Sequence, residues 1–256
     1  MQKEFIHKIS KGSRFNQIYI PKEASNFEVG DIVKVILLGK KQELYYSKNL
    51  SKLSEFKENL IKQVFSFLNK FKEIKQAFII GSFLAKKTEY KDIDILLIYE
   101  KSTKNIEKIS SSLLDKFEIN FHIISIPQEI LNKLEKTCPL TRSMLYYFVS
   151  NKQYNLPAET GIDKKHINFL LMMPQDILEV SLESRAFYDS LRRLLTIQTF
   201  LENKELNQIK IEKELEKLIN PLLLSLIKSN QPIDDSSLRN LRKIIKNKIQ
   251  KIKKML

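Results

Sequence analysis

The alternation of hydrophobic and polar residues divides the chain into three regions. Residues 1–48 contain short apolar or alternating runs separated by Gly and Pro, a pattern typical of short strands and turns. These runs are residues 5–9, 17–20 and 31–38. Residues 50–156 mix strand-like runs with helical periodicity. From about residue 160 to residue 256, apolar positions recur every three or four residues, which predicts an all-helical region.

The middle region predicts a sheet flanked by helices. Apolar runs that suit buried strands are residues 77–80, 92–98 and 117–126. Segments with helical periodicity surround them, at residues 51–75, 105–116, 127–135 and 140–148. With a β-rich segment before it and helices after it, this region predicts an α+β protein.

In the helical region, Pro174 and Pro221 predict interruptions, because proline lacks the backbone N–H that a helix interior uses. We expect helices over residues 163–173, 174–202 and 206–227, the last of them broken at Pro221. The final helix is predicted to begin at Asp235 and Ser236, residue types that favour the N-cap position.

Composition and charge narrow the class of protein. A formal net charge of +14 and a pI near 9.6 favour anionic partners. The single cysteine, Cys138, excludes an intramolecular disulfide and suits a reducing compartment. No run approaches the roughly 18 apolar residues of a membrane span, and the first residues lack the apolar segment of a signal peptide. We therefore expect a cytoplasmic protein without membrane association.

The most informative chemistry lies between residues 77 and 98. The predicted strand at 77–80 ends in Gly81 and Ser82, and nine residues later Asp92 and Asp94 open the next predicted strand. Because side chains alternate along a strand, the two aspartates share one face and the isoleucines beside them share the other. Two carboxylates opposite a Gly-Ser turn can bind a divalent metal ion and nucleotide phosphates.

This arrangement of an apolar strand, Gly81-Ser82, a nine-residue spacer and Asp92-x-Asp94 resembles the signature of the DNA polymerase β-like nucleotidyltransferase superfamily. The resemblance covers residues 50–156 and implies that superfamily's fold, a mixed sheet with helices. It implies that Gly81 and Ser82 bind the triphosphate of an NTP, with ATP as the first choice, and that Asp92 and Asp94 hold two Mg²⁺ ions. The implied reaction transfers a nucleoside monophosphate to an acceptor hydroxyl and releases pyrophosphate.

The resemblance also implies a third carboxylate on the next strand, predicted at residues 117–126. Glu118 is the only acid there, near the start, and Asn120 and His122 occupy polar positions on the same face. Glu118 is therefore the candidate third metal ligand and catalytic base. His122 either holds a water that serves as base or is a polar residue at a sheet edge, satisfied by a hydrogen bond. Without a base, the site would bind nucleotide without efficient turnover.

In the first region, the string KISKGSRFNQIYIPK from Lys8, followed by VGDIVKV from Val29, resembles the AbrB/SpoVT family of swapped hairpins. The resemblance covers about forty residues, and the link between the two strings is shorter than is usual in the family. It implies an intertwined homodimer that presents basic loops to DNA, with Lys8, Lys11 and Arg14 as the corresponding charges. The alternative is an ordinary β-hairpin that caps the catalytic domain of a monomer.

In the final predicted helix, positive charges surround an apolar stripe, and no acid follows Asp235. The candidate nucleic-acid contacts are Arg239, Arg242, Lys243 and Lys246, and further lysines continue to the end of the helix. A solvated helix packed by its apolar stripe explains the stripe but not the charges. A basic helix on a membrane surface is a further alternative.

These observations predict a Mg²⁺-dependent nucleotidyltransferase associated with RNA or DNA. Its expected domains are residues 1–48, 50–156 and 160–256. The competing class is a nucleotide-sensing, DNA-binding regulator or antitoxin-like protein whose nucleotidyltransferase fold has lost turnover.

Overall fold

The computed structural model describes residues 8–19, 30–33, 35, 42–85, 90–100, 105–180 and 183–256. The chain divides into two compact units, Met1–Lys41 and Gln42–Leu256. The predicted boundary near residue 48 falls inside the second unit, because strand β3 (Tyr45–Tyr46) pairs with strand β7 (Val149–Ser150).

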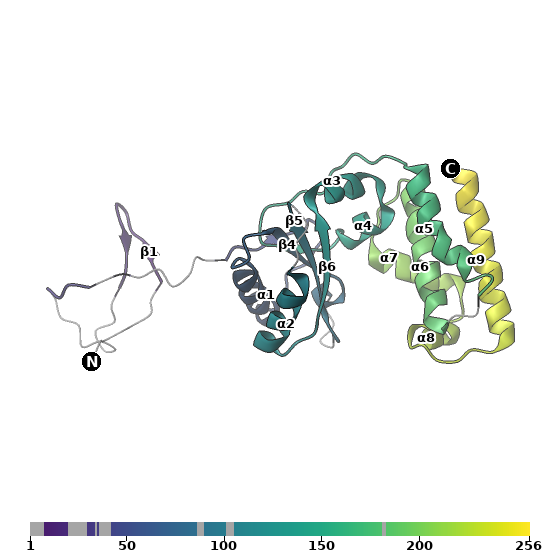
Figure 1. The fold of residues 1–256 in the computed structure, drawn as a ribbon, viewed down its shortest axis with the longest axis horizontal. Coiled ribbons are helices and arrows are strands. Elements are labelled where there is room, and N and C mark those ends of the chain that lie inside the picture. Colours follow the sequence, from purple (N-terminus) through teal and green to yellow (C-terminus); the bar gives the residue numbers. More distant parts are fainter. Residues whose placement is uncertain are drawn as a thin grey trace. The chain divides into compact units, whose positions relative to one another are not determined.

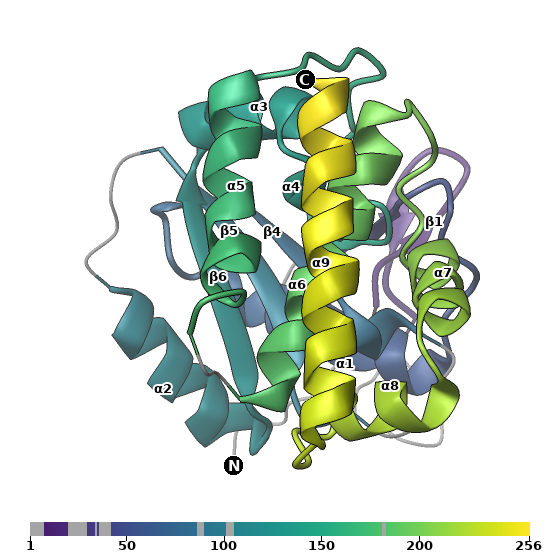
Figure 2. The same ribbon diagram turned by 90° about the vertical axis from the view of Figure 1, so that its right-hand side faces the viewer.

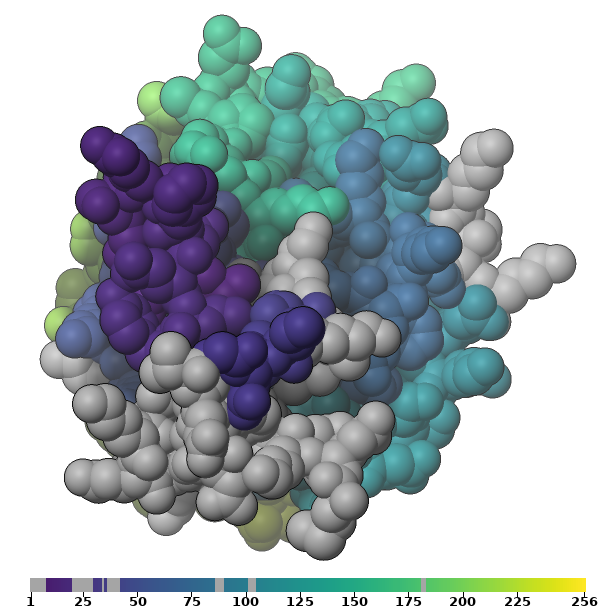
Figure 3. All heavy atoms as spheres, turned by 90° about the vertical axis from the view of Figure 1, so that its left-hand side faces the viewer, coloured from purple at the N-terminus to yellow at the C-terminus, as the bar shows by residue number. Residues whose placement is uncertain are grey.

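The described residues of the first unit contain a two-stranded antiparallel ribbon. Strand β1 (Ser10–Lys11) pairs with β2 (Asn16–Gln17), and the Gly12 N–H donates to the Phe15 carbonyl at 3.1 Å. Much of the predicted 5–9 and 31–38 runs lies outside the described residues, and residues 31–33 and 35 are not in strands. The N-terminal part of this unit is purple in Figure 3. Large apolar side chains among its described residues are exposed, including Phe15 at 79% and Ile32 at 100%.

A mixed sheet forms the centre of the second unit and confirms the predicted α+β class. Among the described residues it has five strands in the order β3-β7-β4-β5-β6. The strands not yet given are β4 (Ile74–Ile80), β5 (Ile93–Tyr99) and β6 (Phe121–Pro127). Only the β5–β6 pair is parallel among these strands. Helix α2 (Ile106–Phe117) makes the connection that a parallel pair requires.

Helices cover both faces of the sheet (Figure 1), and each face has its own hydrophobic core. On one face, Ile79, Ile93 and Ile95 pack under α1 (Glu55–Leu68) and α2. On the other face, Phe78 and Leu96 pack with Leu131 of α3 (Gln128–Thr137), and α4 (Pro139–Met144) follows α3. Alternation along β5 therefore separates the isoleucines from the face that carries Asp94.

A helical bundle follows the sheet and has its own core. Its helices are α5 (Lys164–Asp176), α6 (Ser184–Leu201), α7 (Gln208–Leu218), α8 (Pro221–Lys228) and α9 (Asp235–Met255). Helix α6 contacts the other four, and α9 lies along the outside of the bundle (Figure 2). Pro221 starts α8 as predicted, and Asp234, one residue earlier than expected, caps α9 by accepting from the Ser237 N–H at 2.9 Å.

The predicted break at Pro174 is wrong, because Pro174 lies inside α5. A proline in a helix leaves the carbonyl four residues earlier without its usual donor. Here that carbonyl, on Leu170, accepts from Nη1 of Arg193 on α6 at 3.4 Å. The neighbouring helix thus supplies the missing hydrogen bond, and the break between α5 and α6 falls after Asp176 instead.

The predicted boundaries of two other elements also need correction. The helix expected over residues 51–75 is shorter: Ser54 caps α1 by accepting from the Lys57 N–H, and the chain leaves the helix at Asn69 before entering β4. The strand expected from residue 117 begins at Phe121, because α2 extends through Phe117.

Candidate functional site

The residues predicted to carry chemistry lie at neighbouring ends of strands β4, β5 and β6. Gly81 follows the last residue of β4, Asp94 is the second residue of β5, and His122 is the second residue of β6. The strand register pairs Ile80 with Asp94 and Asp94 with His122. Asp94 and His122 therefore lie side by side on the face that carries Phe78 and Leu96, and Gly81 follows the residue opposite Asp94, so that these three residues form a row across the sheet.

Gly81 is required at its position for two reasons. Its backbone has φ 76° and ψ −158°, a combination that is essentially restricted to glycine. A Cβ atom on Gly81 would lie 3.0 Å from Cγ of Asp94 and closer still to its Oδ2 atom. The Asp94 carboxylate thus occupies the space that any other residue at position 81 would fill.

The residues after Gly81 form a single 3₁₀ turn, Ser82–Leu84. Phe83 and Leu84 are buried, whereas Ser82 is exposed. The described chain after Gly81 is therefore this short turn, and residues 86–89 lie outside the described part of the chain.

Asp92 lies immediately before β5 and is half-buried. The next residue, Ile93, donates its N–H to the Asn120 carbonyl at 3.0 Å, which fixes the entry into the strand beside β6. Asp92 is one residue outside the pleated strand, so the shared face of Asp92 and Asp94 stays a prediction of strand alternation.

Asp94 and His122 are joined by a hydrogen bond. The Nδ1 atom of His122 donates to Oδ1 of Asp94 at 2.9 Å, since a carboxylate oxygen can only accept. The Asp94 side chain is 27% exposed and that of His122 is 62% exposed. With Oδ1 bound to His122 and Oδ2 over Gly81, the carboxylate has a defined orientation.

Glu118 does not lie on the strand where the sequence placed it. It is the C-cap of α2, with a left-handed φ of 54°, and its N–H donates to the Leu114 carbonyl at 2.8 Å. Its side chain is exposed, three residues before β6 begins. The sheet position beside Asp94 is occupied by a histidine instead, so the placement of a third acid in this row was wrong.

The oxygen ligands at this site fit Mg²⁺ if a bound nucleotide supplies further ligands. Mg²⁺ is commonly bound by one or two carboxylates together with substrate phosphates and water, and Asp92 and Asp94 supply two carboxylates at one edge. Within the part of the chain that the structure describes, no group of three or more His, Cys, Asp or Glu side chains is arranged to hold a metal ion. The residues therefore fit an ion that shares its ligands with a bound nucleotide, rather than a site built from protein alone.

The basic residues of α9 divide into two groups. Arg242 donates from Nε to the Ile177 carbonyl at 3.3 Å and from Nη2 to the Val180 carbonyl at 3.2 Å. It thus supplies hydrogen bonds to backbone carbonyls just after the end of α5. Lys248 donates to Gln198 at 2.9 Å, and burial lowers the pKa of Lys248. Lys251 lies 3.5 Å from Glu202. These three charges stabilise the bundle, which the sequence did not indicate.

The remaining charges of α9 are exposed: Arg239, Lys243, Lys246, Lys253 and Lys254. In the first unit, the side chains of Lys8, Lys11 and Arg14 are described, and those of Lys11 and Arg14 flank the β1–β2 turn. All three of these basic side chains are exposed, as is Ser13 within the turn.

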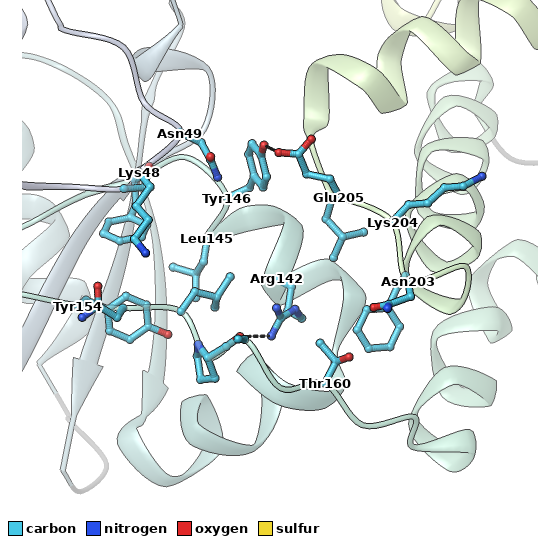
Figure 4. A pocket seen from close by; sticks show the side chains of 18 of the residues that line it. Lys48, Asn49, Arg142, Leu145, Tyr146, Tyr154, Thr160, Asn203, Lys204 and Glu205 are labelled. Atoms are coloured by element: carbon cyan, nitrogen blue, oxygen red, sulfur yellow. Dashed lines mark hydrogen bonds between the residues drawn. The ribbon is translucent and has the colours of Figure 1, made fainter.

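A cavity of about 330 Å³ lies between the sheet and the helical bundle (Figure 4). Its wall includes Phe148, beside β7, and Tyr146, whose hydroxyl donates to Glu205 before α7. Burial and this carboxylate raise the pKa of Tyr146. Arg142 donates from Nη1 to the Glu135 carbonyl at 2.6 Å and to the Pro157 carbonyl at 3.0 Å. No local pattern in the sequence marks these residues, because they come together only through the tertiary fold.

The cavity and the Gly81–Asp94 row share one edge of the sheet. The Ser47 N–H donates to the Phe148 carbonyl at 3.0 Å, and the β4–β7 register places Ile79 opposite Val149, the residue after Phe148. Phe148 is thus two strands from Asp94, which corresponds to roughly 10 Å at the usual strand spacing.

Residues 62–146 match the model of a protein family described as polymerase beta, nucleotidyltransferase. The matched segment contains Gly81, Ser82, Asp92, Asp94 and His122. No curated protein matches the chain. Among the described residues, no helix combines the length and apolar character that a membrane crossing requires.

Proposed function

From the match of residues 62–146 to the polymerase beta, nucleotidyltransferase family model, we propose that the protein transfers a nucleoside monophosphate from an NTP to an acceptor hydroxyl. The observation that carries the proposal is the contact between Gly81 and Asp94. A glycine-only backbone conformation holds a Gly-Ser turn directly against a carboxylate at the start of the next strand. This arrangement can bring phosphates and a cation-binding group together.

Each residue of the row has a role in this proposal. Gly81 allows the backbone to approach the triphosphate, and the exposed Ser82 hydroxyl binds a phosphate oxygen. Asp92 and Asp94 would hold Mg²⁺, which neutralises phosphate charge and activates the acceptor oxygen when it is bound. His122 orients the Asp94 carboxylate through its 2.9 Å hydrogen bond.

The direct test measures pyrophosphate release and label transfer from each of the four NTPs with Mg²⁺ and candidate acceptors. Asp94→Asn is expected to lower the rate by on the order of a thousandfold, the usual scale for losing one preorganised electrostatic group. Asp115→Asn, on the exposed side of α2, is the matched control and should leave the rate unchanged. Equal rates for Asp94→Asn and wild type would contradict the assignment.

We place the nucleoside, or the acceptor that meets it, in the cavity beside the row. The cavity wall at Phe148 lies roughly 10 Å from Asp94, a span that a nucleotide can bridge. Thr160→Trp fills the cavity from an exposed position and should weaken NTP or acceptor binding. Unchanged binding constants for both ligands would place the substrates elsewhere.

A nucleotide-binding regulator without turnover is the second candidate function. It is favoured by one observation: the sheet position paired with Asp94 holds His122, and Glu118 lies outside the strand. Calorimetric titration with Mg²⁺ and each NTP, run beside the activity assay, separates the two. Binding without pyrophosphate release across many acceptors supports the regulator, whereas release supports the enzyme.

Nucleic acid is the partner that we propose for the exposed face of α9. Truncating α9 would be a poor test, because Leu241 and Ile245 belong to the bundle core. Replacing Arg239, Lys243 and Lys246 by Gln removes exposed charge only. If these residues contact phosphates, the triple variant should bind RNA or DNA more weakly and with a shallower salt dependence, since fewer counterions are released. An unchanged salt slope would exclude this face.

A second copy of the chain is the partner that we propose for the first unit. Within its described residues, Phe15, Tyr19, Ile32 and Val35 all expose more than half of their surface. A segment this small buries too little apolar area by itself, and pairing two copies would cover these side chains. The AbrB-like dimer, like the role of Lys8, Lys11 and Arg14 in DNA binding, remains a proposal.

A further inference from the structure

Lys57 is a buried lysine near the start of α1. Its exposed fraction is 8%, although lysine is rarely buried. It lies in the first helical turn, where the positive end of the helix dipole disfavours a cation, whereas the neighbouring Glu55 and Glu58 suit that position. The local helix therefore gives no reason for a lysine here.

The contacts of Lys57 lead to the residues that follow Gly81. Its Nζ atom donates to the Phe83 carbonyl and to the Ala85 carbonyl, each at 2.7 Å. It also lies 5.1 Å from the centre of the Phe83 ring and 5.9 Å from that of Tyr90. Both carbonyls belong to residues 81–85, which we call the Gly81–Ala85 turn.

Two internal hydrogen bonds shape this turn. Leu84 donates its N–H to the Gly81 carbonyl at 3.3 Å, and Ala85 donates to the Ser82 carbonyl at 3.0 Å. At one end Gly81 lies against Asp94, and at the other end the carbonyls bind Lys57. Ser82, between these two attachments, is exposed.

We propose that Lys57 is a positioning residue for the nucleotide site: by binding the Phe83 and Ala85 carbonyls from the protein interior, it fixes the Gly81–Ala85 turn so that Ser82 faces the phosphates. This inference rests on the proposed function. Hydrogen bonds to a charged donor are stronger than neutral ones, and an ordered binding segment avoids the entropic cost of ordering on binding.

The test uses the full-length protein and two variants of this residue. Lys57→Met keeps much of the side-chain volume and removes the donors, and Lys57→Arg keeps the charge in a different geometry. Calorimetry measures the Kd for ATP with Mg²⁺, and hydrogen exchange measures the Leu84 and Ala85 amides without nucleotide. We expect Lys57→Met to raise the Kd by about tenfold and to speed exchange at both amides.

Two controls separate positioning from general destabilisation. Lys62→Met removes a partly exposed lysine from the same helix and should change neither measurement. Ile249→Val, in the core of the bundle, should lower the unfolding temperature but leave the Kd unchanged. If Lys57→Met does not fold, Lys57→Arg decides, because its planar group cannot reproduce both bonds and should also raise the Kd and the exchange rates.

If the wild-type protein binds ATP and the Lys57→Met variant binds it with the same Kd, the role of Lys57 is overturned, but the proposed function is not. Weaker binding without faster exchange at Leu84 and Ala85 also overturns it, because the turn would then not carry the effect. If Ile249→Val loses as much ATP affinity as Lys57→Met, the loss reflects general stability, and the inference about Lys57 is overturned. A wild-type protein that binds none of the four NTPs overturns the proposed function, and the nucleotide role of Lys57 with it.

Discussion

Replacing Gly81 by alanine tests the geometry of the site most sharply, because two separate costs coincide there. A non-glycine residue at φ 76° and ψ −158° costs about 1–3 kcal/mol in backbone strain. The added Cβ would also lie 3.0 Å from Cγ and 3.3 Å from Cβ of Asp94. That side chain must move, and its 2.9 Å hydrogen bond to His122 must then lengthen or break.

We therefore expect Gly81→Ala to lose about 2–4 kcal/mol of folding free energy, from the backbone strain together with the lost hydrogen bond. At about 2–4 °C per kcal/mol for a chain of this size, the unfolding temperature should fall by roughly 4–16 °C. Affinity for ATP with Mg²⁺ should fall at least tenfold, because the displaced Asp94 carboxylate no longer faces the turn.

Two other glycines provide matched controls. At Gly161 a Cβ would meet only Thr137 Cγ2, at 4.0 Å, so Gly161→Ala should be close to neutral. At Gly30 φ is 108°, and among the described residues no atom of a non-neighbouring residue lies within 4 Å of an added Cβ, so Gly30→Ala reports backbone strain without a clash from them. Differential scanning calorimetry and isothermal titration measure all three. A Gly81→Ala protein with wild-type unfolding temperature and affinity would refute the reasoning.

Three further predictions concern other parts of the molecule. Arg193→Met removes the donor to the Leu170 carbonyl and should lower the free energy of unfolding by about 1–3 kcal/mol in urea titrations; no change would mean that water satisfies this carbonyl. Hydrogen bonds from Lys204 and Gln198 lower the pKa of Glu202 to about 2. Its ionised form therefore stabilises the fold above the unfolded pKa of about 4.5, and this contribution is lost as the pH falls through 2. The difference in unfolding temperature between wild type and Glu202→Gln should then shrink over that interval, and a constant difference would contradict it. Light scattering should find two 30.2 kDa chains per particle for the full protein and one for a shortened protein that starts at Gln42; a monomeric full chain would exclude the dimer.

Local sequence signals were enough to predict the central residues of the site, Gly81 and Asp94. The apolar run before Gly81 predicted the strand that ends there, and the run from Asp92 predicted the next strand, which the structure has from Ile93, with Asp94 as its second residue. These features depend on strand alternation and on the conformational freedom of glycine, which operate over a few residues. The same short segment carries the resemblance to the polymerase β-like superfamily, and it lies within residues 62–146, which match the family model.

The errors and omissions involve contacts between distant residues or a choice between competing local structures. Glu118 could begin a strand or end a helix, and the helix extended far enough to make it the C-cap. Pro174 remains within a helix only because Arg193 binds the carbonyl it leaves without a donor. Lys57 reaches carbonyls 26 and 28 residues away, and no periodicity in the sequence encodes that distance.

The strand order also has a consequence for synthesis of the protein on the ribosome. Strand β4 pairs on one side with β5, which follows it closely, and on the other side with β7, which is made only at residues 149–150. Until then the nascent chain has an unpaired edge at Phe78 and Ile79, two residues that are fully buried in the finished fold. Ribosomes that stall before Val149 would leave this edge open to pairing with other chains, so steady translation through residue 150 protects the protein from aggregation.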